Sequence, residues 1–212
     1  MNPQYMSGFF CGFTIIPGQA QTSIIRSAAL AGTTLISIAL IIGPLARLTR
    51  RNYIFHRRTI GVWGFTFIIL HVLTVVAYTL NFNLLLIWQP LDPFINPLIF
   101  GAIAFVLFLP VYFTSTDWAI IKLGADKWKN VHRIAYFAYI FSILHYILIS
   151  PRWFSNAANF LLFALTVIAL TLQVLAFIKT VKKTHSRKAA VAGVIIILFG
   201  TIMFLMTFTN IL

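Results

Sequence analysis

The sequence predicts an all-α, polytopic membrane protein with six transmembrane helices. Hydrophobic residues make up 60% of the 212 residues and charged residues only 9%, whereas charged residues are about 25% of an ordinary soluble domain. Apolar windows long enough to cross a bilayer, which takes about 20 helical residues, occur six times. A transmembrane β-barrel is excluded because its strands are about half that length and alternate in polarity.

The six predicted spans form one membrane domain, residues 24–212, which follows an N-terminal lead-in, residues 1–23. The lead-in has an apolar patch with no basic residues before it, so we interpret it as a surface or re-entrant segment rather than a cleaved signal peptide. No connection is long enough for a soluble domain of about 50 residues. In order, the spans are residues 24–43, 59–80, 97–115, 131–150, 157–178 and 189–211.

The distribution of positive charge predicts the orientation. The net charge is +13, and all Lys and Arg residues except Arg26 and Arg152 lie in or beside the first, third and fifth connections. The positive-inside rule therefore puts these connections in the cytoplasm and both termini outside it. We expect a multi-pass protein of the inner (plasma) membrane whose basic residues contact anionic lipid and not nucleic acid.

Two histidines, His71 and His145, lie deep inside the second and fourth predicted spans. A titratable ring at bilayer depth costs free energy unless its nitrogen lone pair is occupied, so each is a candidate functional residue. They follow the cytoplasmic starts of their helices by 12 and 14 residues, which brings both to one depth in the outer half of the membrane. Two imidazoles at one depth predict axial ligation of a b-type heme. The alternative is that each ring only hydrogen-bonds a carbonyl or a hydroxyl.

Gly61 and Gly64 on the second span would let a macrocycle approach the backbone, although membrane helices also use glycine for plain packing. His132 opens the fourth span, 13 residues before His145, and is a candidate ligand of a second heme about 20 Å nearer the cytoplasm. The sequence leaves the partner of His132 undecided among three alternatives. His132 could pair with His56, bind heme together with a different sixth ligand, or hold a heme propionate beside a basic residue. The basic candidates at this depth are Arg57, Arg58 and Arg133.

Several absences exclude other kinds of site. No carboxylate lies inside a predicted span, which disfavours ion-coupled transport and a catalytic triad, and we expect no catalytic residues. One cysteine, Cys11, excludes an internal disulfide and a cysteine-ligated metal. Glycine-rich nucleotide fingerprints are absent, and we expect His185, in a basic connection, to be solvated. The acidic residues, all in connections or at helix ends, are Asp92, Asp117 and Asp126.

An ordered series of short motifs extends over about residues 26–150. It comprises Pro44-Leu-Ala-Arg47, Arg57-Arg-Thr-Ile-Gly61, Leu70-His71, Phe113-Thr-Ser-Thr116, Leu123-Gly124, Trp128, His132, Tyr136 and Leu144-His145-Tyr146. This series resembles the ferric-reductase-like transmembrane superfamily and, within it, the MsrQ (YedZ) family of heme-binding membrane subunits. The order of the motifs and the 13-residue histidine spacing are more specific than any single motif.

The resemblance implies one or two hemes b, with the heme-associated histidines of the family at His71, His132 and His145. The fourth histidine of membrane NADPH oxidases falls at Arg57, as it does in MsrQ-like chains. Two features depart from the family pattern. MsrQ-like proteins usually carry a further helix before the one equivalent to residues 24–43, and this chain extends beyond Lys188 with a sixth apolar segment.

The function expected from these features is transfer of electrons from the cytoplasmic side to an extracytoplasmic acceptor, as a subunit of an oxidoreductase system. The sequence has no flavin or nicotinamide domain, so the donor is a separate reductase or membrane quinol. The resemblance suggests a cytoplasmic flavin reductase or the quinone pool, allows for FMN at the inner face, and suggests a periplasmic methionine sulfoxide reductase as acceptor. The alternatives are a stand-alone transmembrane ferric reductase and a non-redox transporter or structural membrane protein.

Overall fold

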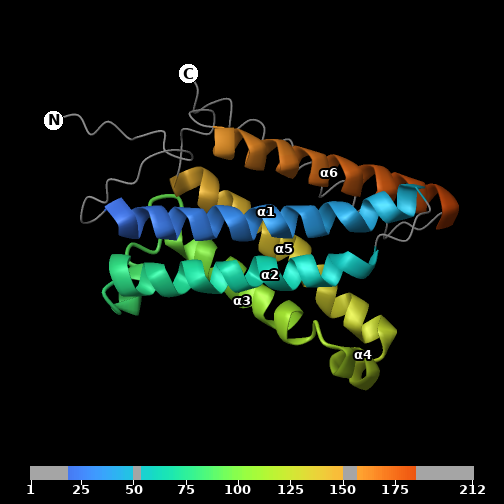
Figure 1. Ribbon diagram of the computed structural model, residues 1–212, viewed down its shortest axis with the longest axis horizontal. Coiled ribbons are helices and arrows are strands. Elements are labelled where there is room, and N and C mark those ends of the chain that lie inside the picture. The colour runs from blue at the N-terminus through green and yellow to red at the C-terminus, as the bar shows by residue number, and fades with distance from the viewer. Residues whose placement is uncertain (1–18, 50–53, 150–156, 185–212) are drawn as a thin grey trace.

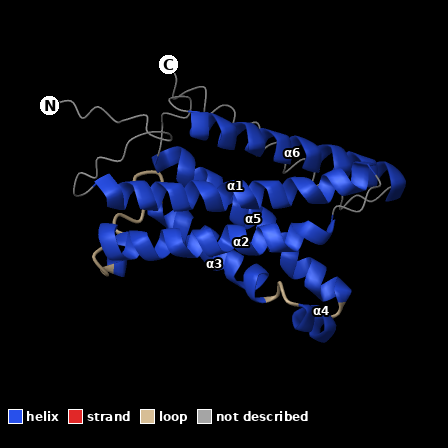
Figure 2. Ribbon diagram, in the orientation of Figure 1, coloured by secondary structure: helices blue, strands red, loops and turns tan. Residues whose placement is uncertain are grey.

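The structure is a computed structural model that describes residues 19–49, 54–149 and 157–184, and helices are the regular elements of these residues (Figure 2). This confirms the all-α prediction. In chain order the elements are α1 (Gln19–Thr49), α2 (Ile54–Thr74), the π-helical turn η1 (Val75–Thr79), the 3-10 turn η2 (Leu84–Trp88), α3 (Leu98–Phe113), α4 (Asp117–Leu123), α5 (Ala125–Ile149) and α6 (Ala157–Thr184).

Four of these helices are long and apolar enough to cross a membrane: α1, α2 with η1, α5 and α6. A fifth candidate is the pair formed by α3 and α4, whose axes are bent by 85°. The described residues therefore contain four or five spans, and the predicted six are not confirmed. The predicted sixth span, residues 189–211, lies outside the described residues, as do residues 1–18 of the lead-in and Cys11.

Several helices extend beyond the predicted spans. Helix α1 begins at Gln19, inside the predicted lead-in, and continues through Pro44 to Thr49. Helix α5 begins six residues before position 131 and α6 ends six residues after position 178. The extensions contain Ala, Lys, Arg and Gln, which have high helix propensity. The apolar window therefore located the apolar part of each helix and not the ends of the helix.

The helices pack in pairs around one core (Figure 1). Helix α1 packs along α2 on one side and along α6 on another, and α3 packs against α5. Helix α4 turns away from α3 at one end of the bundle. The turn lies at residues 114–116, where Thr114 and Ser115 bond back to backbone carbonyls of α3 and Thr116 accepts from the Ala119 amide as the N-cap of α4. Such side-chain bonds compete with continuation of a helix.

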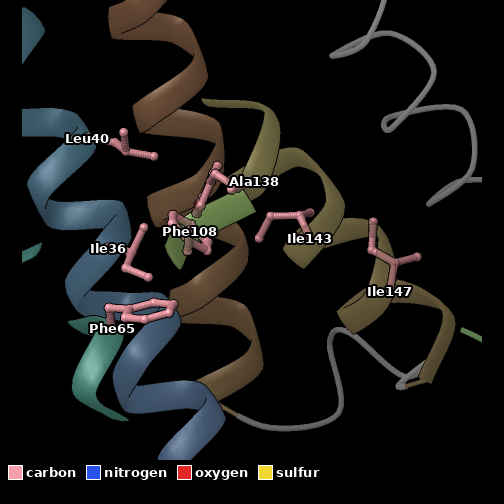
Figure 3. Close-up of a cluster of buried hydrophobic side chains, with 8 residues drawn as sticks. Ile36, Leu40, Phe65, Phe108, Ala138, Ile143 and Ile147 are labelled. Atoms are coloured by element: carbon pink, nitrogen blue, oxygen red, sulfur yellow. The ribbon is translucent and has the colours of Figure 1, made fainter. Parts of the chain in front are cut away.

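The buried core joins α1, α2, α3 and α5 (Figure 3). Phe65 of α2 is 3% exposed, and its ring lies 5.6 Å from Phe105, 5.8 Å from Phe108 and 4.9 Å from Tyr112 between ring centres. Such aromatic contacts add to the area that the rings bury. The cluster itself comprises Ile36, Leu40, Phe65, Phe108, Ala138, Tyr139, Ile143 and Ile147.

Gly64 allows α1 and α2 to approach closely. A Cβ at Gly64 would lie 3.1 Å from the Gly32 carbonyl oxygen and 2.9 Å from Ile36, and a Cβ at Gly32 would lie 2.9 Å from the Gly64 carbonyl oxygen. Gly61, also in α2, faces Ala39 of α1. Gly64 therefore serves the packing of α2 on α1, which fills the space in front of it, and Gly61 also faces α1. Of the two interpretations of these glycines, helix packing is the one that the contacts favour.

A buried hydroxyl network joins α1, α5 and α6 in the same bundle. The Tyr139 hydroxyl lies 2.8 Å from Ser37 Oγ and 2.9 Å from Thr166 Oγ1. Ser37 also contacts the Thr33 carbonyl oxygen at 2.7 Å, and Thr166 contacts that of Leu162 at 2.8 Å. Polar groups in the apolar interior are thus paired with one another, as burial requires.

Candidate heme site

His71, in the last turn of α2, is held by α1. Its Nδ1 lies 2.9 Å from the carbonyl oxygen of Ile25, 46 residues earlier in the chain. A carbonyl oxygen can only accept, so Nδ1 carries the proton and donates it. The proton on Nδ1 leaves the lone pair on Nε2, which is the nitrogen available to bind a metal.

His145, in the last turns of α5, is held in the same way by a different element. Its Nδ1 lies 2.8 Å from the carbonyl oxygen of Pro97, the N-cap residue of α3. The same carbonyl accepts from the backbone amides of Phe100 at 3.1 Å and Gly101 at 3.4 Å. The ring is thereby fixed to the start of α3, and its Nε2 also keeps the lone pair.

The structure brings these two rings together. Their centres lie 6.5 Å apart and their planes make an angle of 66°. The sequence argument expected the two histidines at one depth on different helices, and the measured separation agrees with that expectation. The rings come from α2 and α5 and are both partly buried.

The residues present fit an iron porphyrin held by two axial histidines. An imidazole nitrogen binds a first-row metal at about 2 Å, so a shared metal holds two such nitrogens about 4 Å apart, and the ring centres lie further out. A centre-to-centre separation of 6.5 Å is in this range. Both donors are neutral imidazoles with Nδ1 hydrogen-bonded to a carbonyl, the outer partner that metal-binding histidines usually have. The described residues contain no group of three His, Cys, Asp or Glu side chains that could hold a metal alone.

Gly101 is a site residue that the sequence argument missed. A Cβ at this position would lie 2.8 Å from both Cε1 and Nδ1 of His145, closer than a Cβ contact can be. The carbonyls of Ile25 and Pro97 were also missed. Backbone acceptors have no signature in the sequence, but a glycine one turn after Pro97 in a span could have indicated a close approach.

His132 lies in a second cluster, separate from this pair. Its Nδ1 contacts the carbonyl oxygen of Trp128 at 3.1 Å and its Nε2 lies 3.3 Å from Ser115 Oγ. Its ring packs on the Trp128 indole at 3.9 Å between centres, and the indole nitrogen donates to the carbonyl oxygen of Thr114 at 2.9 Å. The bend between α3 and α4 thus contributes Ser115, which contacts His132, and the Thr114 carbonyl, which holds the neighbouring Trp128 ring.

The three candidate arginines have different surroundings. Arg57 is partly buried, donates through Nε to the Ala39 carbonyl oxygen at 3.1 Å, and interacts electrostatically with His132. Arg58 forms an ion pair with Asp117 at the start of α4. Arg133 is exposed and donates to Asn130 of its own helix at 3.1 Å. Arg57 is therefore the arginine that the structure brings to His132.

The remaining histidines are His56 and His185. His56 is exposed at the start of α2. His185 lies outside the described residues. The predicted site residues thus separate into the pair of His71 and His145 and a second group of His132 with Arg57, whereas Arg58 and Arg133 contact other side chains.

Comparison with known proteins adds a family to this geometry. The model of the family "Ferric reductase like transmembrane component" matches residues 28–143, which is more than half of the chain. This match includes His71 and His132 and ends two residues before His145. No solved structure matches the chain significantly.

Three similar proteins illustrate the relationship. The heme-binding subunit MsrQ of protein-methionine-sulfoxide reductase from Caulobacter vibrioides is 31% identical over 129 residues, covering 59% of this chain and 60% of that protein. The MsrQ subunit from Brucella anthropi is 29% identical over 55% of this chain and 52% of its own length. The magnetosome protein MamZ from Magnetospirillum gryphiswaldense is 37% identical over 54% of this chain and 18% of its own length.

The chain spans about half to three fifths of the length of the MsrQ proteins it matches. The match lies in the helical region that contains both histidine clusters, and the described helices include four or five candidate spans. The protein is thus a multi-pass helical membrane protein, and it belongs to the ferric reductase-like transmembrane component family.

Proposed function

We propose that this protein is a heme b electron-transfer subunit that carries electrons across the membrane. The observation that carries the proposal is the histidine pair, whose ring centres are 6.5 Å apart with each Nδ1 bonded to a carbonyl oxygen. The names of the MsrQ relatives, which describe heme-binding subunits, support the same cofactor. The alternative of purely hydrogen-bonded histidines explains the Nδ1 contacts but gives no reason for two rings from different helices to lie 6.5 Å apart.

His71 and His145 would hold the outer heme, which supplies an iron that alternates between the ferric and ferrous states. With an imidazole from each of the two residues, the iron would have no open position for a substrate, which would favour electron transfer. The carbonyls of Ile25 and Pro97 keep the proton on each Nδ1 and the lone pair on each Nε2. The apolar side chains of the core limit the access of water.

His132 and Arg57 form the inner end of the proposed path. We propose His132 as the ligand of a second heme and Arg57 as a partner for its propionates, because guanidinium groups pair with carboxylates in bidentate fashion. The contact between Ser115 Oγ and His132 Nε2 is long, at 3.3 Å, so ligation would replace a weak contact. Arg58 and Arg133 are second choices, since each already has a side-chain partner.

The proposed direction is from the cytoplasm outward. The basic residues of α2 and α5 lie at the end of the bundle that contains His132, and the positive-inside rule assigns that end to the cytoplasm. A flavin reductase or quinol, with FMN as a further cofactor at this face, would be the donor. A periplasmic methionine sulfoxide reductase is the acceptor we propose, on the names of the relatives.

Absorption spectra of the purified protein test the cofactor. We expect a Soret band that is lost or strongly reduced in His71→Ala and in His145→Ala and retained in His56→Ala, a matched control in an exposed histidine. A protein without a Soret band would leave only the structural or transport alternative. A band that is undiminished in both His71→Ala and His145→Ala would show that this pair does not hold a heme.

A stand-alone ferric reductase is the second candidate, and the family description favours it. The reduced protein should be mixed with a methionine sulfoxide reductase and, separately, with ferric chelates. Oxidation by the methionine sulfoxide reductase is the expected result. Oxidation by the chelates alone would replace our partner assignment with direct reduction of ferric iron at an exposed heme edge.

A further inference from the structure

The connection between α2 and α3 is apolar on its outside. Residues 80–97 lie at the end of the bundle opposite Arg57 and Arg58, and their one charged side chain is Asp92. Eight large apolar side chains of this loop are exposed, four of them between 66% and 75%. These residues are Phe82, Leu84, Leu85, Leu86, Trp88, Leu91, Phe94 and Ile95. A contiguous apolar surface of this kind marks contact with lipid or with another molecule.

Much of the backbone of the same loop is hydrogen-bonded from within. Asn96, which is 8% exposed, donates through Nδ2 to the carbonyl oxygens of Leu86 at 3.2 Å, Ile87 at 3.1 Å and Pro90 at 3.4 Å. Its Oδ1 accepts from the Leu98 amide at 3.3 Å. The buried Asn96 side chain therefore holds the middle of the loop close to the start of α3 through these four hydrogen bonds.

In two other turns of the loop, a side-chain oxygen also accepts a hydrogen bond from a backbone amide. Asn83 Oδ1 accepts from the Leu85 amide at 3.2 Å, and Asp92 Oδ1 accepts from the Phe94 amide at 2.9 Å. Backbone bonds from Phe82 to Val76 and from Asn83 to Leu80 continue the pattern from the end of α2. Even the single carboxylate of the loop is engaged by the backbone.

This combination distinguishes a lipid-facing loop from a water-facing one. A loop in water can leave its backbone groups to the solvent and usually has polar side chains, whereas non-helical backbone at membrane depth must be satisfied by protein. A protein partner would not require the loop to satisfy its own backbone bonds. Exposed large side chains also precede the loop, at Leu73 near the end of α2 and Tyr78 in η1.

We propose that residues 82–95 are inserted in the apolar part of the membrane interface, with lipid acyl chains covering their exposed side chains. Trp88 lies at the end of η2, where its amphipathic indole suits the boundary between acyl chains and headgroups. The loop would fix the height of the start of α3 in the bilayer. The proposal does not depend on heme binding, because it rests only on the loop.

Site-directed spin labelling tests this insertion. The single cysteine, Cys11, is replaced by Ser, and a nitroxide is attached in Leu85→Cys and, separately, in Leu91→Cys. The full chain is reconstituted in vesicles of phosphatidylcholine and phosphatidylglycerol. Collisions of each label with oxygen, which concentrates in lipid, and with a water-soluble nickel chelate are measured by power saturation.

Two control positions calibrate the result. Leu73→Cys, on the exposed face of α2 and 61% exposed, reports lipid, and Asp126→Cys, with a side chain 98% exposed at the start of α5, reports water. We expect labels 85 and 91 to lose nickel collisions to the level of position 73 and to gain oxygen collisions. Unchanged thermal unfolding of each labelled variant shows that it folds, and either loop position is sufficient.

Nickel collisions equal to those at position 126 would overturn the proposal and leave the loop as a surface for another protein. Protection from nickel that disappears when the protein is diluted in lipid would also overturn it, because a second copy of the chain would then be the cover. Protection that is independent of dilution, with high oxygen collisions, supports lipid.

Discussion

Gly101 is the residue on which the position of His145 depends most directly. In Gly101→Ala the new Cβ would lie 2.8 Å from two ring atoms of His145. Replacing glycine by alanine in a helix gains about 1 kcal/mol, but overpacking costs about 1–3 kcal/mol. The steric cost should exceed the gain in helix propensity, so we expect displacement of the His145 ring and a marked loss of bound heme.

Gly61→Ala is the matched control, because its Cβ would meet the Ala39 side chain at an ordinary 3.8 Å. This variant should keep its heme and unfold at an equal or slightly higher temperature. Heme per mole of protein and the thermal midpoint are measured for both variants. Full heme content in Gly101→Ala would contradict the assigned role of Gly101.

Asn96 is a second residue whose contribution can be isolated. Asn96→Asp keeps an acceptor for the Leu98 amide but removes the donor to the three carbonyls. Because buried groups left without partners cost about 1–3 kcal/mol, we expect a lower unfolding temperature and faster proteolysis of residues 80–97. Equal proteolysis in Asn96→Asp and the parent protein would show that the amide does not hold the loop.

At the scale of helices, Tyr139 connects three of them through its hydroxyl. The network has three hydroxyl protons for four contacts, since Ser37 and Thr166 also have backbone acceptors. Removal of the Tyr139 hydroxyl therefore leaves Ser37 and Thr166 each with a backbone carbonyl oxygen as acceptor. Tyr139→Phe should cost only about 1 kcal/mol, whereas Tyr139→Ala, which also empties a buried volume, should cost about 3–5 kcal/mol. Denaturant unfolding measures both free energies. Equal losses in Tyr139→Phe and Tyr139→Ala would show that the hydroxyl, and not the buried ring, contributes most of the stability.

The ion pair between Arg58 and Asp117 joins α2 to α4. The hydrogen bond from Arg58 holds the pKa of Asp117 below its ordinary value. A lowered folded pKa means that the pair stabilises the fold above the unfolded carboxyl pKa of about 3.9, and that this contribution is lost as pH falls through the folded pKa.

Asp117→Asn removes this dependence on pH. The parent protein should be more stable than the variant at neutral pH, and the difference between them should shrink as the pH falls below about 4. Both side chains are exposed, so the difference should also shrink in high salt. Asp126→Asn is the control for loss of an exposed carboxylate. A difference in unfolding temperature that is constant across this pH range would contradict the assignment.

At the scale of the whole molecule, the sequence predicted the features that depend on long apolar runs. The helical class and the approach of His71 to His145 followed from length and residue counting. The ends of α1, α5 and α6 did not, because good helix formers extend a helix past the bilayer edge. The bend before α4 depends on hydroxyl bonds of Thr114, Ser115 and Thr116, and the carbonyls that hold the histidines have no residue type of their own.

The most direct test of the account is the electron paramagnetic resonance spectrum of the oxidised, purified protein. Two imidazoles on ferric heme iron should give a low-spin signal. The part of this signal that belongs to the pair should be lost in both His71→Ala and His145→Ala, and the whole signal should be retained in His56→Ala. If a second heme is bound at His132, substitution of His132 should remove only the part of the signal that this heme contributes. A low-spin signal that persists unchanged in both His71→Ala and His145→Ala would contradict ligation by this pair.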